Sequence, residues 1–253
     1  MAIGTTDWRD IDVVLPGVVV PVAVSARRAV VSWSGGKDCT LALSRARKDP
    51  HLNPVTLLTT YGEETGRVGH HGVPVRLIEQ QATALDLSLE TVPLPPACQN
   101  AVYESRMAEV VDGLAARGIE VCVFGDIALD DVRAYRENRL AGSGVDPMFP
   151  LWGVDTTTLA EEFVTTYRAT VVAIDRSTLG REAVGRPYDR SFLADLPPGT
   201  DPAGERGEFH TFVHDGPLFE TAVEATRGRT VERSFEGETY AYVDLAASTD
   251  GRD

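Results

Sequence analysis

The chain has 253 residues, 43% of them hydrophobic, and a formal net charge of −14 at pH 7. This composition supports a hydrophobic core for one large domain or two small ones, and the acidic balance argues against an extended surface that grips nucleic acid through its phosphates. The longest uncharged run, residues 13–26, is interrupted by two prolines and a glycine, so we expect neither a membrane span nor an export signal and place the protein in the cytoplasm.

The chain opens with residues 1–21, which we predict as an arm because acidic and polar residues give way to an apolar run with two prolines. From residue 22 onward, short β-branched runs alternate with longer amphipathic stretches, a rhythm typical of an α/β fold with a parallel sheet. The pattern predicts strands over 29–33, 55–61, 87–92 and 120–124, and helices over 38–48, 74–85 and 100–117.

The first strand, turn and helix follow one another directly and form a candidate phosphate cradle. Gly35 and Gly36 lack the Cβ atoms that would hold a phosphate away from the backbone, and the helix that starts near Asp38 aims its N–H groups and positive dipole end at the same place. Lys37 adds a mobile positive charge. The spacing differs from the Walker and dinucleotide-binding patterns, and an ordinary strand-to-helix turn is the alternative interpretation.

The segment Ser34-Gly35-Gly36-Lys37-Asp38 resembles the PP-loop, SGGxDS, of the N-type ATP pyrophosphatases. The resemblance implies that residues 34–39 bind the pyrophosphate end of ATP. Cys39 stands where that pattern has its second serine, so the weaker donor of a thiol replaces a hydroxyl. A thiol at a helix start can have a lowered pKa and be reactive, or it can simply pack there. With Cys98 and Cys122 it makes three widely spaced cysteines without a CxxC pair, which favours reduced thiols.

The loop after the second strand, residues 62–72, is rich in glycine and polar residues, and we predict that it is mobile. It carries His70 and His71, which either close over a bound nucleotide or lie in solvent. Ligands of open parallel sheets bind beyond the carboxyl ends of the strands, near the point where the strand order reverses. We therefore expect the phosphate loop, this loop and the Gly125-Asp126 corner to surround one cleft.

The rhythm changes after residue 145. An irregular apolar segment over 147–152 is followed by a helix over 157–167, a strand over 170–174, a stretch over 180–207 rich in glycine and proline, a strand over 209–213, and a strand pair over 230–245 around Gly237. We therefore predict an α/β domain over residues 22–145 and a smaller, mixed α+β substrate-binding domain over residues 146–253. In the first domain, the helix over 100–117 is expected to bury Val102, Met107, Val110, Val111 and Leu114.

Residues 204–213, with the sequence Gly-Glu-Arg-Gly-Glu-Phe-His-Thr-Phe-Val, form a second unusual cluster. Glu205 and Glu208 each follow a glycine and lie next to an aromatic residue and a histidine. A core strand would not tolerate these charges unless they were paired or coordinated. The alternative is a solvated turn that leads into a strand.

The phosphate loop, the segment Gly125-Asp126-Ile127 and residues 204–211 together resemble the diphthine–ammonia ligase family of the PP-loop superfamily, over residues 27–220. The resemblance implies a doubly wound parallel sheet of the HUP type with a smaller C-terminal domain. It also implies an ATP-dependent, AMP-forming ligase that adenylates a substrate carboxylate, releases pyrophosphate and transfers ammonia to the acyl group. ATP and Mg²⁺ are the expected cofactors.

The resemblance assigns roles to the residues of both motifs. The negative charge of the leaving pyrophosphate is stabilised by Lys37, by the loop amides and by a magnesium ion held by Asp38. Glu205 and Glu208 shape the pocket that receives ammonium, and one of them with a raised pKa serves as general base. The other motif residues expected to contact substrate are Gly204, Gly207, Phe209 and His210.

Three further side chains are candidates for substrate binding. Asp126 either faces the nucleotide or acyl group or only caps a helix. Arg133 and Arg136 share a helix face with Glu137, so they either grip an anionic substrate or form a structural ion pair.

The expected partners are ATP, ammonia and a carboxylate-bearing substrate, either a small molecule or a modified protein side chain such as diphthine on elongation factor 2; a homodimer stays open. Two alternatives to the ligase are a PP-loop thiolase acting on tRNA and an ATP-binding sensor without chemistry. The acidic charge and the missing CxxC count against the thiolase.

Overall fold

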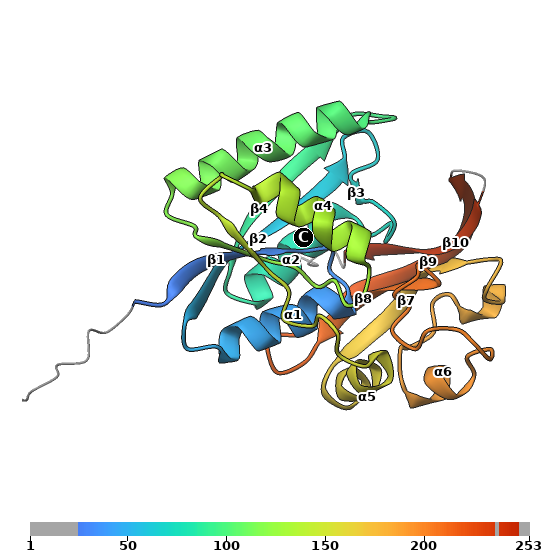
Figure 1. Ribbon diagram of the computed structural model, residues 1–253. Helices are drawn as coiled ribbons and strands as arrows, with labels where there is room; N and C mark the ends of the chain where they lie inside the picture. Colours follow the sequence, from blue (N-terminus) through green and yellow to red (C-terminus); the bar gives the residue numbers. More distant parts are fainter. Residues whose placement is uncertain (1–24, 236–237, 248–253) are drawn as a thin grey trace, which may run out of the picture.

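A computed structural model describes residues 25–235 and 238–247, so the predicted arm and the turn at Gly237 lie outside the described residues. Figure 1 shows two sheets, one built from the first part of the chain and one from the last part, with helices packed around them. The strand order and the burial pattern explain how the phosphate loop comes to lie between them.

The first sheet is built on five parallel strands in the spatial order β4-β2-β1-β5-β6. Their bounds are Arg27–Ser32 for β1, Leu52–Gly62 for β2, Ser88–Leu94 for β4, Val121–Val123 for β5 and Asp146–Met148 for β6. A short strand, β3 (Arg67–Val68), pairs antiparallel with the end of β2. The strand order reverses at β1, which pairs with β2 on one side and β5 on the other, and the phosphate loop follows β1.

Helices cover both faces of this sheet, which makes it doubly wound. They are α1 (Lys37–Lys48), α2 (Val75–Ala84), α3 (Asn100–Ala116) and α4 (Asp130–Leu140). Ala29 and Val31 belong to a buried cluster with residues of α1 and α2, whereas Val30 between them belongs to a second cluster with Leu114 of α3 and Leu140 of α4. A strand buried on both faces needs a continuous apolar run, and this requirement accounts for the sequence Ala-Val-Val in β1.

The C-terminal part is a four-stranded antiparallel sheet in the order β8-β7-β10-β9, flanked by short helices. The elements are α5 (Thr156–Thr166), β7 (Arg168–Asp175), a 3-10 turn η2 (Arg181–Ala183), α6 (Arg190–Ala194), β8 (Phe209–Asp215), β9 (Ala225–Phe235) and β10 (Glu238–Ala247). Asp155 caps α5, because its side chain accepts a hydrogen bond from the backbone N–H of Thr158 at 2.8 Å. The fold is therefore a doubly wound parallel sheet with a mixed α+β C-terminal part, as predicted.

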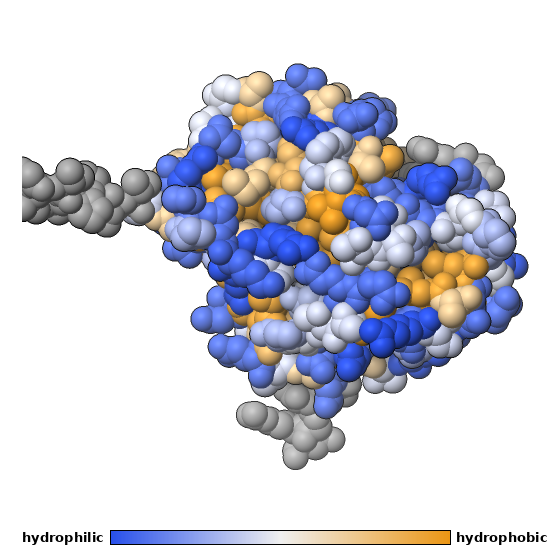
Figure 2. Space-filling view, turned by 60° about the horizontal axis from the view of Figure 1, so that its bottom comes forward, coloured by the Kyte–Doolittle hydropathy of each residue, from blue (hydrophilic) through white to orange (hydrophobic). Residues whose placement is uncertain are grey.

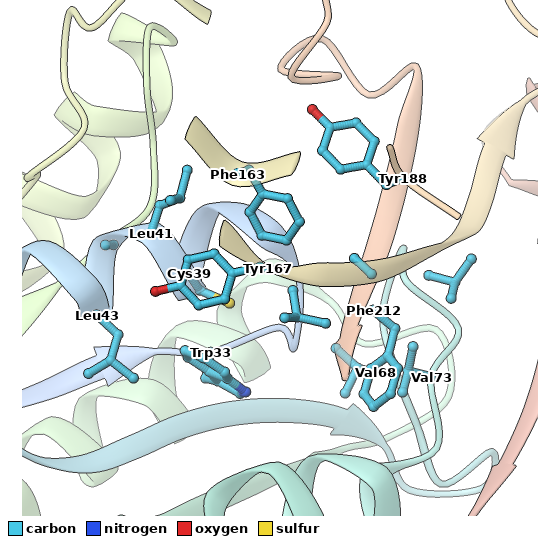
Figure 3. Packing of buried hydrophobic residues seen from close by; sticks show 14 of the residues in the cluster. Trp33, Cys39, Leu41, Leu43, Val68, Val73, Phe163, Tyr167, Tyr188 and Phe212 are labelled. Atoms are coloured by element: carbon cyan, nitrogen blue, oxygen red, sulfur yellow. The ribbon is translucent and has the colours of Figure 1, made fainter. Parts of the chain in front are cut away.

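The two parts share one hydrophobic cluster. Phe163 of α5, Tyr167 and Tyr188 belong to the same cluster as Cys39 and Leu41 of α1, and Figure 3 shows these side chains gathered between α1 and the strands of the second sheet. Strand β8 also contacts α1, and β10 contacts α2. The C-terminal sheet is consequently packed against the helices that carry and support the phosphate loop.

Two predictions about local structure were wrong. The segment over 147–152 was expected to be irregular, but Asp146–Met148 is strand β6, paired with β5, so the first sheet extends beyond residue 145. The side chain of Val102 was expected to be buried and is 39% exposed, because it lies in the first turn of α3, at the end of the buried face. Leu114 of the same helix is buried as predicted, and Met107, Val110 and Val111 are partly buried.

The loop over 62–72, which was predicted to be mobile, contains specific hydrogen bonds and an ion pair. It contains β3 and is closed by a backbone hydrogen bond from Val68 to Val73 of 2.8 Å. The guanidinium of Arg67 donates to the carbonyl of Gly72 at 2.7 Å and pairs with Asp244 of β10 at 2.5 Å. The loop is therefore tied to the C-terminal sheet.

Hydrophilic side chains cover most of the face drawn in Figure 2, with apolar surface in separate areas. This distribution agrees with the large share of acidic residues in the sequence. Within the described residues, no helix has both the length and the apolar character needed to cross a membrane.

Candidate active site

The phosphate loop, Ser34 to Gly36, connects β1 to α1 in a conformation that requires glycine. Gly35 has a φ of 83°, in the left-handed region, and a Cβ at this position would lie 2.6 Å from Cδ1 of Ile78. Gly36 is the N-cap of α1 and, as a glycine, has no side chain with which to cap the helix. The start of α1 therefore lacks a cap from its own N-cap residue, an arrangement compatible with the predicted phosphate cradle.

Strand β8 and a buried glutamine hold this loop. The backbone N–H of Val213 donates to the carbonyl of Gly35 at 2.9 Å. The side-chain amide of Gln81 donates to the same carbonyl at 3.1 Å and to the carbonyl of Val213 at 2.5 Å, and its oxygen accepts from the indole of Trp33 at 2.8 Å. Gln81 is 0% exposed and fully bonded, so it fixes the loop against both α2 and β8.

Gln81 was not among the residues predicted from the sequence. The available signal was a polar residue between Ile78 and Ala82, on the side of the helix that the periodicity places in the core. A buried polar side chain in that position needs partners, and a backbone turn nearby supplies them.

Lys37 and Asp38 form an ion pair at the first turn of α1. Lys37 is 4% exposed, its Nζ lies 2.8 Å from Oδ2 of Asp38, and it sits 5.5 Å from the centroid of the Phe209 ring. The backbone N–H of Lys37 donates to Oγ1 of Thr211 at 3.0 Å. Burial raises the pKa of Asp38, and the charge and hydrogen bond of Lys37 act in the opposite direction. The pair places a cation beside the open end of the helix without leaving either charge uncompensated.

Glu205 connects the second motif to the corner after β5. Its Oε1 accepts hydrogen bonds from the backbone N–H groups of Ile127 and Ala128, each at 3.0 Å. Burial raises the pKa of Glu205, while the two N–H groups lower it. The charges of Asp38 and Lys37 also act on this carboxyl group, which shows that the two motifs face the same region.

Glu208 has a different position in the same motif. It is 7% exposed, and its two oxygens accept from the backbone N–H groups of Asp201 at 3.1 Å and Arg206 at 3.0 Å. These bonds close the turn in which Gly204 and Gly207 have φ values of 63° and 89°. The structure therefore separates the two carboxylates: Glu205 reaches the corner beside α1, and Glu208 organises its own turn.

Phe209 was expected to contact substrate, but its ring lies in the core. It is 0% exposed, with ring centroids 5.5 Å from Tyr188 and 5.2 Å from Phe192. Gly204 packs against it, because a Cβ on that glycine would lie 2.9 Å from the carbonyl oxygen of Phe209. These residues shape the segment that carries Glu205 and His210.

The corner after β5 touches the first turn of α1. A Cβ on Gly125 would lie 2.8 Å from the carbonyl carbon of Asp38 and 2.9 Å from the nitrogen of Cys39, so only glycine allows this approach. The next residue, Asp126, pairs with Arg136 of α4 at 2.6 Å between Oδ2 and Nε. The guanidinium of Arg136 also lies 4.5 Å from the ring centroid of Phe124. Asp126 and Arg136 are thus partners of one another beside the site.

Arg133 precedes Arg136 in α4. Its Nε donates to Oε1 of Glu137 at 2.7 Å, which is the structural ion pair left open by the sequence. Its guanidinium lies 4.7 Å from the ring centroid of Trp152 and 5.2 Å from that of Phe149. The three side chains form a cation–π stack after β6.

Three histidines come together beside the phosphate loop. The ring centroid of His210 lies 4.6 Å from that of His71 and 6.1 Å from that of His70. A Cβ on Gly36 would lie 2.8 Å from Nε2 of His71. Burial, followed by the charge of Lys37, lowers the pKa of His71 to about 3, and burial also places the pKa of His210 well below its usual value. Both imidazoles are neutral at pH 7.

The thiol of Cys39 is buried rather than activated. Its Sγ donates to the carbonyl of Gly36 at 3.1 Å and lies 3.7 Å from Oγ of Ser34. Burial raises the pKa of Cys39, which supports the alternative that this thiol simply packs at the helix start. Cys39, Cys98 and Cys122 are all free thiols.

The described residues contain no group of three or more His, Cys, Asp and Glu side chains arranged to hold a metal ion. Asp38 is a single carboxylate beside the open helix end. This fits Mg²⁺, which proteins commonly bind through one or two carboxylates while substrate phosphates and water complete its coordination.

The structure thus brings the phosphate loop, the His70-His71 turn, the Gly125-Asp126 corner, Glu205 and His210 together around the first turn of α1. Two protein-family models match this chain, one for the diphthamide synthase N-terminal domain over residues 27–146 and one for the diphthamide synthase C-terminal domain over residues 155–246. A search of curated proteins finds no significant match. Among solved structures, a predicted subunit of tRNA methyltransferase from Methanocaldococcus jannaschii is similar, with 17% identity, a TM-score of 0.41, and coverage of 74% of this chain and 96% of that one.

Proposed function

The chain belongs to the diphthamide synthase family, and on that premise we propose that it is an ATP-dependent, AMP-forming ligase. It adenylates a substrate carboxylate, releases pyrophosphate and transfers ammonia to the acyl group, as a diphthine–ammonia ligase does. The substrate is a carboxylate-bearing small molecule or modified protein side chain, and the reaction takes place in the cytoplasm.

The observation that carries the proposal is the joining of the two motifs at one helix start. Lys37 donates its backbone N–H to Thr211, and Glu205 of the same C-terminal segment accepts from the corner that touches Asp38 and Cys39. A site that must both activate an acid with ATP and deliver ammonia to the activated acid needs the two sets of groups side by side. The packing of β8 on the phosphate loop supports this arrangement.

The first half of the reaction falls to the phosphate loop. The N–H groups at the start of α1 that Thr211 does not bind, together with the Lys37 ammonium, stabilise the negative charge that develops on pyrophosphate as it leaves. Asp38 would hold Mg²⁺, which when bound neutralises phosphate charge. Lys37 is already fixed by Asp38, so it needs little reorganisation when the nucleotide binds.

The second half falls to Glu205. Its raised pKa makes this carboxylate a better base than an exposed glutamate, and its Oε1 is anchored by two N–H groups. In this role Glu205 removes a proton from ammonium and leaves neutral ammonia to attack the acyl carbon. Glu208 positions Glu205 by holding the turn on which both lie.

The test is isotope exchange between pyrophosphate and ATP in the presence of a panel of carboxylic acids that includes diphthine-bearing elongation factor 2. We expect exchange that requires one of the acids, and its absence over the whole panel contradicts the ligase. Lys37→Met should lower the rate about 100-fold or more, as the loss of one preorganised electrostatic group does. Lys48→Met is the matched control, because Lys48 is the only other lysine and is exposed at the far end of α1.

The same assay distinguishes the two alternatives. Nucleotide binding without exchange under any condition favours an ATP-binding sensor. Adenylation of tRNA instead of a carboxylic acid favours a thiolase. In both cases the Glu205 carboxylate has no ammonium to deprotonate, so Glu205→Gln should leave the observed activity unchanged.

A further inference from the structure

Two histidines that the proposed reaction does not use contact each other beside the phosphate loop. His71 comes from the turn between β3 and α2, and His210 comes from β8, so distant parts of the chain supply the pair. Their ring centroids lie 4.6 Å apart with the planes tilted by 33°. The histidine pair lies next to Gly36 of the phosphate loop, because a Cβ on Gly36 would lie 2.8 Å from Nε2 of His71.

The ring of His71 is held in this place by the backbone around it. The backbone N–H of His71 donates to the carbonyl of Gly69 at 2.5 Å, across a tight turn in which His70 has a φ of 53°. The next residue, Gly72, accepts from Arg67, which is paired with Asp244 of β10. The left-handed conformation costs free energy for a non-glycine residue such as His70. The hydrogen bonds and the ion pair around this turn maintain that conformation.

The Lys37 ammonium is the positive charge that acts on both rings. His71 is acted on by Lys37 of α1 and by His70 in its own turn, and His210 is acted on by His71, His70 and Lys37. Lys37 is paired with Asp38, whose charge partly offsets its own. Together with the open start of α1, these groups make a region that suits an anion with several oxygens.

We propose that His71 and His210 are phosphate-binding residues that hold the terminal phosphates of a nucleoside triphosphate, next to Lys37 and Gly36. The inference rests on the proposed ATP site and extends it to two side chains outside the loop. Phosphate oxygens close to the rings supply the negative charge that favours a protonated imidazole. One imidazole therefore takes up a proton from solution when the phosphates bind. The N–H group formed in this way donates to a phosphate oxygen.

The experiment is isothermal titration calorimetry on the full chain at pH 6.5, with α,β-methylene-ATP and Mg²⁺ as the probe. Titrations in PIPES and in bis-Tris, whose ionisation enthalpies differ, give the number of protons taken up on binding. We expect net uptake by the unmodified chain and a loss of most of it in the double variant His71→Asn, His210→Asn. His214→Asn, on the same strand β8 but outside the histidine pair, should leave the proton number unchanged.

Affinity supplies a second measurement. Each single variant should bind the triphosphate analogue about tenfold or more weakly, as expected for a lost hydrogen bond to a charged group. The affinity for AMP, which lacks the terminal phosphates, should stay within about twofold. Inorganic pyrophosphate should follow the triphosphate analogue.

Several results would overturn the inference. They are no binding of the analogue, no proton uptake by the unmodified chain, equal uptake by the double variant, or an equal loss of affinity for AMP. Thermal unfolding checks that each variant is folded, and the glutamine variants His71→Gln and His210→Gln replace any that is not. If acid-dependent exchange is absent while proton-linked binding persists, the ligase proposal fails and the phosphate-binding role stands.

Discussion

The hydroxyl of Thr211 accepts a hydrogen bond from the backbone N–H of Lys37 at 3.0 Å, so a side chain of the C-terminal sheet completes the first turn of α1. Helix starts normally satisfy these N–H groups with an N-cap side chain, and the N-cap here is a glycine. The missing cap is therefore replaced from another part of the chain. This replacement fixes the backbone of the phosphate loop only when β8 is in place.

Thr211→Val should destabilise the protein by about 1–3 kcal/mol, because a similar volume is kept while a buried N–H loses its acceptor. Urea unfolding measures the change. Thr211→Ser keeps the hydroxyl and is the control, expected to lie closer to the unmodified protein. A valine variant as stable as the unmodified protein would mean that water or a shift of the helix satisfies the N–H of Lys37.

Gly125→Ala should lower stability and nucleotide affinity together. The new Cβ would meet backbone atoms of Asp38 and Cys39 at 2.8–2.9 Å, and a backbone cannot move aside as a flexible side chain does. We expect a loss of about 1–3 kcal/mol in the free energy of unfolding, measured by urea titration. Gly113→Ala is the matched control, because its Cβ would enter open space on α3 and should stabilise the helix by up to about 1 kcal/mol.

Glu205→Gln and Glu208→Gln should differ in their effects. Glu205→Gln keeps an oxygen that can accept from Ile127 and Ala128, so we expect a folded protein that still binds nucleotide and exchanges pyrophosphate but no longer forms amide. Glu208→Gln places an NH₂ group against one of two backbone donors, so we expect a loss of about 1–3 kcal/mol in stability. Amide formation and urea unfolding, measured on both variants, separate the two roles. Full amide formation by Glu205→Gln removes this residue from the chemistry.

His71 should make the protein less stable in mild acid. An unfolded histidine takes up a proton near pH 6.5, whereas burial lowers the pKa of native His71 to about 3. The unfolded state therefore binds more protons between these values, and the free energy of unfolding falls as pH decreases, by about 2 kcal/mol at pH 5. The comparison of His71→Asn with the unmodified protein at pH 7, 6 and 5 isolates this contribution. His51→Gln, at an exposed position, should not change the slope.

The sequence was sufficient to predict the elements whose pattern is strong. The Ala-Val-Val run of β1, the glycine turn after it and the periodicity of α1 and α2 each indicate one structure, and both functional motifs were identified from local spacing. Strand β6 was missed because Asp146, Pro147 and Met148 are too few to show an alternating pattern, and only the pairing with β5 makes them a strand. Val102 was misplaced because periodicity does not show where along a helix the contact with the sheet ends.

Many residues of the candidate site could be predicted from the sequence, but their arrangement in space could be predicted less well. Spacing identified Glu205 and Glu208 as a pair, but their separation into a contact with Ile127 and a turn closure depends on where Gly204 and Gly207 direct the backbone. Gln81 was not predicted because its amide NH₂ donates to backbone carbonyl groups, which any residue supplies. Long-range contacts of this kind carry no local signature.

The hydrogen bonds of Gln81 affect whether the protein can be divided into separate fragments. Its amide spans the carbonyl groups of Gly35 and Val213, which belong to the two halves of the chain matched by separate family models. A fragment that ends before β8 would retain every residue of the SGGxDS-like motif and still lack Val213, the donor to Gly35, and Thr211, the acceptor for Lys37. The conformation of the phosphate loop is thus a property of the assembled chain, and an excised N-terminal half would lack the contacts that hold it.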